Sequence, residues 1–277
     1  MDEPARRDAV TVLVDEPTPL RAWIAEVRAH REVLSILARK DFHVRYKRAS
    51  FGVLWAVGVP VLQGLVMAAV FSRVVKVAGG SGYPSFVLSG VIVFAYFSST
   101  VIAATTAIVD SASLTDKVWF PRVLLVLVPT LSNLVGFFVS MLVVVGVAEF
   151  RGQPLGAQIL WFVPGMVLLL AFTLSLSLVL SAMHVYFRDT KFFVQAAMLV
   201  WLYATPVLYP KELLGSWAPW IDLNPMTGVV TMFHRGIVDS AETIQPAVTI
   251  TLIWTICLLV VGVRAQRHHD RLFVDML

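Results

Sequence analysis

Hydrophobic and charged residues occupy separate blocks along this chain of 277 residues, a pattern unlike that of a soluble fold. Between residues 48 and 211 the charged side chains lie in small clusters, and long stretches without charge separate them. An α-helix of about 20 apolar residues crosses the roughly 30 Å hydrocarbon core of a bilayer. We therefore predict an all-α integral membrane protein with six transmembrane helices, at about 51–72, 84–109, 123–148, 157–186, 192–208 and 244–263.

The six spans form one predicted transmembrane domain at 49–263, which follows a cytoplasmic N-terminal segment at 1–48 and precedes a tail at 264–277. Basic residues predict the orientation, because cytoplasmic loops of membrane proteins carry an excess of Lys and Arg. With both termini inside, 17 of the 22 Lys and Arg residues fall on inner segments. We predict a multi-pass protein of the cytoplasmic membrane with both termini in the cytoplasm.

The stretch at about 20–37, before the first span, is predicted to form an amphipathic helix. Its apolar residues recur at three- and four-residue steps, with Arg and Glu between them. Trp23 on the apolar side and Arg on the other favour a position in the cytoplasmic membrane interface. Packing on a soluble partner protein is the alternative.

The outer segment at 210–241, between predicted spans five and six, contains two apolar pieces of about ten residues separated by Asn224 and Pro225. Each piece is too short to cross the membrane but long enough for a re-entrant or interfacial helix. The segment is either a structural cap over the bundle or a lid on a pathway, and composition favours neither.

The inner turn at 110–122 also contains more than a linker needs. Ser113 or Thr115 can cap a short helix that Pro121 stops, which would present Val118, Trp119 and Phe120 to the cytoplasm. Two aromatic side chains exposed at this turn indicate a partner surface. Equally, they can be membrane-interface anchors.

Composition and motifs exclude several function classes. Charged residues make up 14% of the chain, against roughly 25% in soluble domains, and Cys257 has no second cysteine to pair with. No glycine precedes a lysine, so the phosphate-binding GK[ST] element is absent, and no metal-ligand spacing occurs in the spans. We expect neither catalysis nor ATP hydrolysis by this chain, no metal site, and no proton relay, because the predicted spans contain no charged residue.

The polar residues of the predicted spans are mostly hydroxyls and amides, and aromatic residues accompany them. Many of these polar groups can form hydrogen bonds between helices. Together with the aromatic rings they also suit a path for a neutral hydroxylated polymer such as a glycan.

Five motifs lie in this frame: RKDFHVRYKRASFGVLWAVGVPVLQ at 39–63, SLTDKVWFPR at 113–122, FRDTKFFVQ at 187–195, TPVLYP at 205–210 and LNPMTGVV at 223–230. Together they resemble those of the ABC-2 type permeases of the O-antigen and teichoic-acid polysaccharide exporter family. The resemblance covers about residues 30–265 and keeps the family's order and spacing. Actinobacterial members look most similar, in particular galactan exporters of the mycobacterial cell wall.

The resemblance implies a half-transporter. Two copies of such a permease pair with two copies of a separate ABC nucleotide-binding ATPase subunit, which binds ATP and Mg²⁺. The membrane chain itself then needs no cofactor. The implied cargo is a polyprenyl-diphosphate-linked glycan, the surroundings are membrane lipids, and no nucleic acid is involved.

The resemblance also implies roles for single residues. Contacts to the ATPase are assigned to Ser113, Leu114, Thr115, Asp116, Lys117, Val118, Trp119, Phe120, Arg188, Asp189 and Lys191. A substrate channel is assigned to Phe42, Tyr46, Phe51, Trp55, Phe94, Tyr96, Phe97, Trp201 and Tyr203. The diphosphate or lipid head group is assigned to Arg45, Lys47 and Arg48, and re-entrant outer gate helices to Leu213, Trp217, Trp220, Asn224, Pro225 and Phe233. For any single basic residue near the inner mouth, setting the topology alone is an equal alternative.

We therefore predict the membrane subunit of an ATP-driven exporter of lipid-linked polysaccharide. Two alternatives stay open. One is an ABC-2 permease for drugs or lipids, and the other is a scaffold for a membrane glycosyltransferase without transport of its own.

Overall fold

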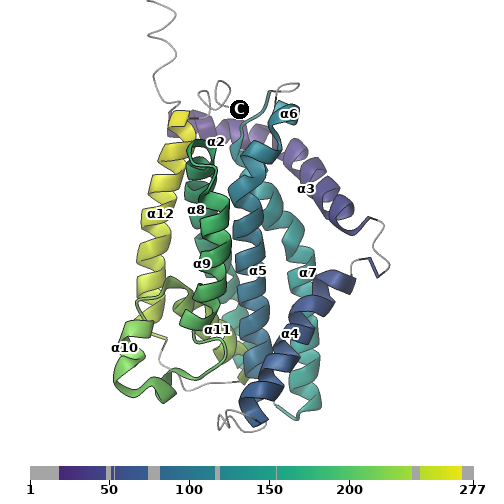
Figure 1. Ribbon diagram of the computed structural model, residues 1–277, viewed down its shortest axis with the longest axis vertical. Helices are drawn as coiled ribbons and strands as arrows, with labels where there is room; N and C mark the ends of the chain where they lie inside the picture. Colours follow the sequence, from purple (N-terminus) through teal and green to yellow (C-terminus); the bar gives the residue numbers. More distant parts are fainter. Residues whose placement is uncertain are drawn as a thin grey trace, which may run out of the picture.

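The computed structural model describes residues 19–47, 51–52, 54–73, 82–115, 119–153, 155–238 and 244–269, and these contain helices and connecting segments but no strand. The long helices lie side by side along one axis, and shorter helices lie at the two ends (Figure 1). The prediction of an all-α protein is confirmed.

Five helical segments of the described chain are long and apolar enough to cross a membrane. They are α4 (Leu54–Arg73), α5 (Tyr83–Asp110), α7 (Val123–Phe150), α8 (Phe162–Tyr186) with the preceding 3₁₀ turn η2 (Ala157–Trp161), and α12 (Ala247–His269). They correspond to predicted spans one to four and six. Helix α12 runs to His269, beyond the predicted end of the last span at 263 and into the predicted tail.

The fifth predicted span, at 192–208, differs from the structure. Helix α9 (Thr190–Ala204) has 15 residues, which corresponds to about 22 Å at 1.5 Å per residue and is shorter than the hydrocarbon core. It ends because Thr205, in extended conformation with ψ 140°, precedes Pro206, and the residue before a proline disfavours helix. Val207 and Leu208 are buried outside any helix. The described part of the chain therefore contains five candidate spans and one shorter apolar helix.

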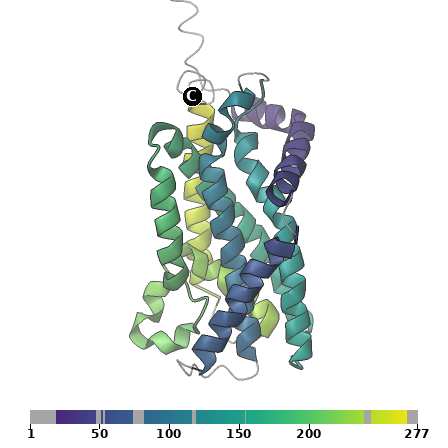
Figure 2. The same cartoon turned by 45° about the vertical axis from the view of Figure 1, so that its right-hand side comes forward.

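The predicted amphipathic helix at 20–37 is divided into α2 (Leu20–Ala29) and α3 (Arg31–Tyr46). The break is at His30, whose ring Nδ1 lies 2.9 Å from the Glu26 carbonyl oxygen. Helix α2 lies across the end of the bundle that also holds the end of α12, and α3 descends obliquely along α7 (Figures 1 and 2).

The outer segment contains the 3₁₀ turn η3 (Lys211–Trp217), α10 (Ala218–Ile221) and α11 (Pro225–Val238). Helix α11 packs against α5, α8, α12 and η2 rather than lying on the surface. Most of its side chains are buried, among them Met226, Val229, Val230 and Phe233. Of the two apolar pieces that the sequence indicates, the second therefore returns into the bundle.

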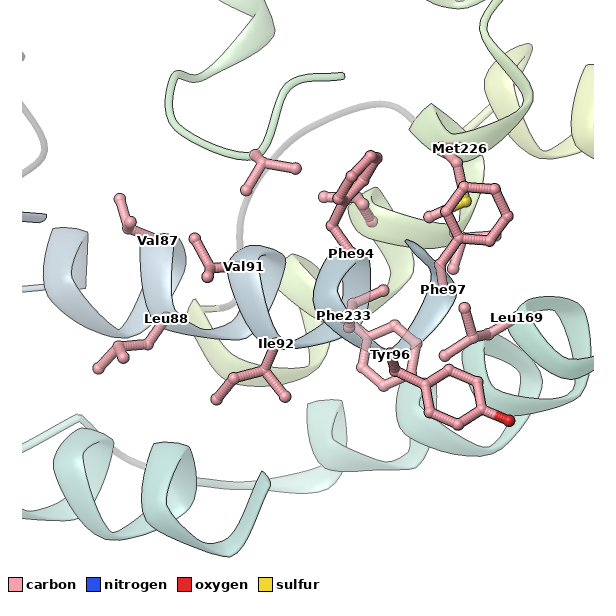
Figure 3. Close-up of a cluster of buried hydrophobic side chains, with 14 of the residues drawn as sticks. Val87, Leu88, Val91, Ile92, Phe94, Tyr96, Phe97, Leu169, Met226 and Phe233 are labelled. Carbon is pink, nitrogen blue, oxygen red and sulfur yellow. The ribbon is translucent and has the colours of Figure 1, made fainter. Parts of the chain in front are cut away.

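Helix α5 forms the centre of the protein, with α4, α7, α8, α9 and α11 packed around it. The Phe97 ring centroid lies 5.6 Å from that of Phe172 on α8 and 5.4 Å from that of Trp201 on α9. Figure 3 shows the resulting cluster, to which α5, α8 and α11 all contribute side chains. Side chains of α5 that are buried in this cluster cannot also line a pathway through the chain.

Candidate coupling, channel and gate sites

The predicted coupling segment lies at the same end of the bundle as α2, beside the short helix α6 (Ala112–Thr115) (Figure 1). Trp119 is 66% exposed, and its ring centroid stands 6.0 Å from that of His30 in an edge-on arrangement. Phe120 is only 5% exposed and packs with Leu124 and Leu125 of α7. The sequence-based interpretation, which grouped Trp119 and Phe120 on one presented surface, needs correction, because Phe120 points into the chain and anchors it.

The other predicted contacts in this segment are only partly described. Ser113 is exposed, Leu114 is half-buried and Thr115 ends α6. Residues 116–118, which include Asp116, Lys117 and Val118, lie outside the described residues.

The second predicted contact with the ATPase is the turn between α8 and α9, at the same end of the bundle (Figure 2). Arg188 and Asp189 are exposed there, and the Lys191 ammonium lies 4.9 Å from the ring centroid of Phe192. The Thr190 hydroxyl donates a hydrogen bond of 2.6 Å to the Phe187 carbonyl and fixes the turn. The turn therefore presents charged groups while a local bond maintains its shape.

The predicted channel aromatics divide into buried and exposed groups. Phe94, Tyr96 and Phe97 on α5 are at most 4% exposed. Phe51, Trp55 and Tyr203 are 48–63% exposed, whereas Phe42, Tyr46 and Trp201 are half-buried. Phe94 and Phe97 belong to the core of a single chain and do not face an open path in this structure, because other helices enclose α5. An accessible aromatic surface is found instead near the start of α4 and on α9.

Arg45, one of the three predicted head-group residues, is already engaged inside the chain. Its guanidinium forms an ion pair of 3.0 Å with Asp41 and donates a hydrogen bond to the side-chain oxygen of Asn133 on α7. Asp41 also accepts a 2.6 Å hydrogen bond from the Ser132 hydroxyl. Lys47 is exposed, and Arg48 lies outside the described residues.

The sequence-based interpretation missed Asp41. Its spacing of four residues from Arg45 on one helix is the signal that could have identified it, because side chains at i and i+4 are neighbours. The Asn133 amide continues the network by donating a 2.9 Å bond to Thr100 on α5. Helix α3 is thus joined through polar contacts to α7 and, through Asn133, to α5.

The residues predicted for the outer gate also divide. Leu213, Trp217 and Trp220 are 60–69% exposed at the end of the bundle opposite α2 (Figure 1), whereas Phe233 is fully buried in the core. The buried position follows from the return of α11 into the bundle. Phe233 is therefore a packing residue in this structure.

Asn224 connects α9 to α11. Its side-chain oxygen accepts hydrogen bonds from the Trp201 indole at 2.8 Å and from the Met226 backbone at 3.0 Å, which caps the first turn of α11. Its amide nitrogen donates to the Ala204 carbonyl and the Thr205 hydroxyl, both at 3.0 Å. Pro225 occupies the first helical position, where a missing N–H has no cost. The break that separates the two apolar pieces in the sequence is thus a rigid junction.

A buried ion pair closes the first part of the outer segment. The Lys211 ammonium lies 2.9 Å from an Asp222 carboxylate oxygen, and both side chains are at most 11% exposed. Just before it, the Tyr209 hydroxyl donates a 3.1 Å bond to the Tyr203 carbonyl, and burial raises the pKa of this phenol. Neither Lys211 nor Asp222 was assigned a partner from the sequence.

The described residues contain no group of three or more His, Cys, Asp or Glu side chains that could hold a metal ion. The described residues form a helical bundle that exposes Trp119 and the turn at Arg188 at one end. Exposed aromatic rings lie near the start of α4 and on α9, and Asn224 holds the outer segment in place at the other end.

Residues 32–237 match the model of the ABC-2 type transporter family. The chain is 29% identical over 240 residues to an O-antigen export system permease protein RfbA of Myxococcus xanthus, covering 83% of this chain and 92% of that protein. Two proteins of the same name from Klebsiella pneumoniae are each 25% identical, over 217 and 251 residues, covering 75% and 89% of this chain and 82% and 95% of the relatives.

The fold and these similarities define a multi-pass membrane permease. The chain belongs to the ABC-2 type transporter family. It is the membrane permease subunit and not an enzyme, it carries no cofactor, and it works with an ATPase subunit.

Proposed function

We propose that this chain is the permease of an ATP-driven exporter that moves a polyprenyl-diphosphate-linked polysaccharide across the cytoplasmic membrane. The observation that supports this most strongly is the similarity to three O-antigen export system permease proteins, which extends over 82–95% of their lengths. Galactan is the first glycan to test, because the sequence motifs look most similar to those of galactan exporters.

The proposed topology has six membrane passages, with α9 and the buried segment after it as the fifth. Both termini lie in the cytoplasm, so α2 and α6 are at the inner end and α10 is at the outer end. A second copy of the chain covers part of the exposed surface of α4 and α9. The exposure of Phe51, Trp55 and Tyr203 supports this arrangement, because the single chain leaves these three large rings uncovered.

The proposed coupling contacts are Trp119, the end of α6 and the charged turn at Arg188. The outer segment that begins with Leu213 is proposed as the outer gate. Asn224 is proposed to hold it in place through its hydrogen bonds to α9 and α11. Lys47 and Arg48 remain candidates for the diphosphate head group, whereas Arg45 is paired with Asp41.

Export in inverted membrane vesicles tests the function. Vesicles that contain this chain and its ATPase subunit should accumulate lipid-linked glycan in a protected form when ATP is supplied, and a protonophore should change nothing. Accumulation that needs a proton gradient rather than ATP would contradict the proposal. Export of a drug or a simple lipid with no movement of glycan would favour an ABC-2 permease for drugs or lipids. Glycan synthesis without export would favour a scaffold for a membrane glycosyltransferase.

Thiol labelling tests the orientation. In a Cys257→Ser background, Trp217→Cys and Trp119→Cys make a matched pair, because the two tryptophans are 69% and 66% exposed at opposite ends of the bundle. An impermeant reagent added to intact cells should label the first variant, and should label the second only after permeabilisation. The reverse result would place the termini outside.

A further inference from the structure

A cavity of about 220 Å³ lies within one copy of the chain, where α3 ends against α7 and α4 begins. Each of three helices turns one face toward it. Helix α7 contributes Asn133, Gly136 and Ser140, which follow at three- and four-residue steps. Helix α4 contributes Ala56, Pro60 and Gln63, and α5 contributes Ile92, Tyr96 and Ser99. The cavity is therefore part of the helix packing rather than a gap beside a loop.

One buried polar side chain on its wall has no hydrogen-bond partner among the described residues. The Ser140 hydroxyl is buried, with the residue 1% exposed, and forms no hydrogen bond. A serine in a helix usually satisfies its hydroxyl on a carbonyl one turn earlier, as Ser175 does with Ala171 at 2.7 Å. The Gln63 side chain on α4 also lines the cavity, but it is exposed. A buried polar group without a partner is costly, which points to a bound polar ligand.

A third polar group follows from the sequence of α4. Pro60 lies inside this helix and supplies no N–H, so the Ala56 carbonyl lacks its usual helical partner. Ala56 and Pro60 both line the cavity. One wall thus offers a free carbonyl acceptor and an amide, and the opposite wall offers a free hydroxyl.

The charge of the cavity excludes a strong site for a phosphate group. Arg45 is the cation at its inner end, and its charge is compensated by Asp41 at 3.0 Å. A diphosphate would have to approach this carboxylate or displace it from the arginine, and like charges at short range repel. A neutral ligand has no such conflict.

The remaining lining residues supply rings. Trp55, Tyr46, Tyr96 and Phe137 border the cavity, and the Tyr96 hydroxyl already donates a 2.9 Å hydrogen bond to the Thr130 carbonyl. Ser140 lies two helical turns beyond Asn133, which is about 10 Å along the axis of α7. Hydroxyl, amide and carbonyl groups combined with aromatic rings favour a neutral, hydroxylated ring.

We propose that this cavity binds a single sugar residue of the exported chain inside one protomer, with Ser140 and Gln63 as hydrogen-bonding residues. The proposal rests on the proposed function for the source of the sugar, and it adds a subsite to it. The residues that line it come from α3, α4, α5 and α7 of one chain.

Protection of an introduced thiol tests the site. Ser140→Cys in a Cys257→Ser background is purified with the ATPase subunit, placed in phosphatidylcholine nanodiscs and alkylated with N-ethylmaleimide. Methyl β-galactoside or methyl β-glucoside should slow the alkylation at position 140 in a saturable way, by about fivefold when the glycoside concentration is about four times its Kd. Inorganic pyrophosphate at the same ionic strength should not.

Two controls separate binding from general effects. The native Cys257, which is exposed on α12, should show no protection by either glycoside in the unmodified chain. Adding Gln63→Leu to the Ser140→Cys variant should abolish most of the protection, whereas Leu142→Ala, which is 69% exposed on α7, should leave it unchanged.

Three results would overturn the proposal: no alkylation at position 140, no protection by either glycoside, or protection by pyrophosphate equal to that by the glycosides. Glycan export by the unmodified complex is measured in parallel. Export without protection refutes the subsite and leaves the proposed function standing, whereas protection without ATP-dependent export refutes the proposed function and leaves the subsite.

Discussion

Helices α4 and α5 are equally hydrophobic, but they occupy opposite environments. In the most apolar window of each helix, 11% of the residues of α4 are buried, against 72% of those of α5. Helix α5 is surrounded by five other helices, whereas α4 contacts mainly α5 and α7 along one face. Hydropathy therefore identifies a span but does not say whether protein, lipid or a second copy covers it.

The difference determines what an aromatic side chain can do. On α5, Phe97 packs between Phe172 and Trp201 and holds three helices together. On α4, Trp55 touches Phe51 at a ring distance of 5.7 Å and is otherwise available. Phe97 on α5 therefore stabilises the fold, whereas Trp55 on α4 is free to meet a substrate or a partner.

The largest effect is expected from removing a ring of α5. Phe97→Ala leaves a cavity in the core and should cost about 3–5 kcal/mol of stability. The thermal unfolding midpoint of the purified protein should fall sharply. Leu62→Ala on α4, which is 59% exposed, is the matched control and should change stability by no more than about 0.5 kcal/mol. Equal midpoints for the two variants would mean that the contrast between the helices is wrong.

The same contrast applies to two adjacent residues at the inner end. Trp119→Ala should weaken binding of the ATPase subunit about thirtyfold, because truncating an interface aromatic costs about 2 kcal/mol, and should leave the unfolding midpoint unchanged. Phe120→Ala should lower the midpoint, because the residue is 5% exposed and packs on α7. Affinity of each variant for the ATPase and its melting curve distinguish the two roles. A Trp119→Ala variant that still binds and stimulates the ATPase normally would remove the coupling assignment.

The membrane-spanning helices could largely be predicted from the sequence, because a long uncharged stretch is itself the signal for a span. Five predicted spans match helices of the structure, and the Asn224–Pro225 break separates the two apolar pieces as expected. The end of α9 at Ala204 was also readable, since Pro206 follows two residues later, but an apolar run by itself does not show where a helix stops.

Side-chain direction could not be read in the same way. Trp119 and Phe120 are neighbours of similar character, and only the packing of Phe120 on α7 separates them. Likewise, Phe94 and Trp55 are both aromatic residues in uncharged stretches of the sequence. Their exposed fractions differ because more helices surround Phe94 on α5 than Trp55 on α4. Asp41 was overlooked because a lone acidic residue in a basic stretch reads as part of a solvated face.

A smaller effect is expected where α3 is joined to α7. Asp41→Asn removes the charge partner of Arg45 and weakens the bond from Ser132. Both members of the pair are about one-third exposed, so solvent screening limits the loss to about 1 kcal/mol. Lys40→Gln, at an exposed neighbouring position, should have no effect on the unfolding midpoint.

A double-mutant cycle with Ser132→Ala sharpens this test. Residues in one hydrogen-bonded network couple by about 0.5 kcal/mol or more, whereas independent sites add. Additive effects of Asp41→Asn and Ser132→Ala would show that the junction between α3 and α7 does not act as a unit.

The smallest change per residue is expected on the exposed aromatic surface, and it should appear in transport alone. Phe51→Ala, Trp55→Ala and Tyr203→Ala each remove a ring that can stack on a sugar, at about 0.5–1.5 kcal/mol per lost contact, or roughly a two- to twelvefold slower step. Export of lipid-linked glycan in vesicles supplied with the ATPase subunit and ATP should slow by this factor. The unfolding midpoint should stay constant, because the three rings are 48–63% exposed and support no core. Val66→Ala, an aliphatic change at a 61% exposed position further along α4, should leave export unchanged. If all three aromatic variants export at the normal rate, these rings do not touch the glycan, and the exposed face of α4 serves contact with lipid or a second copy alone.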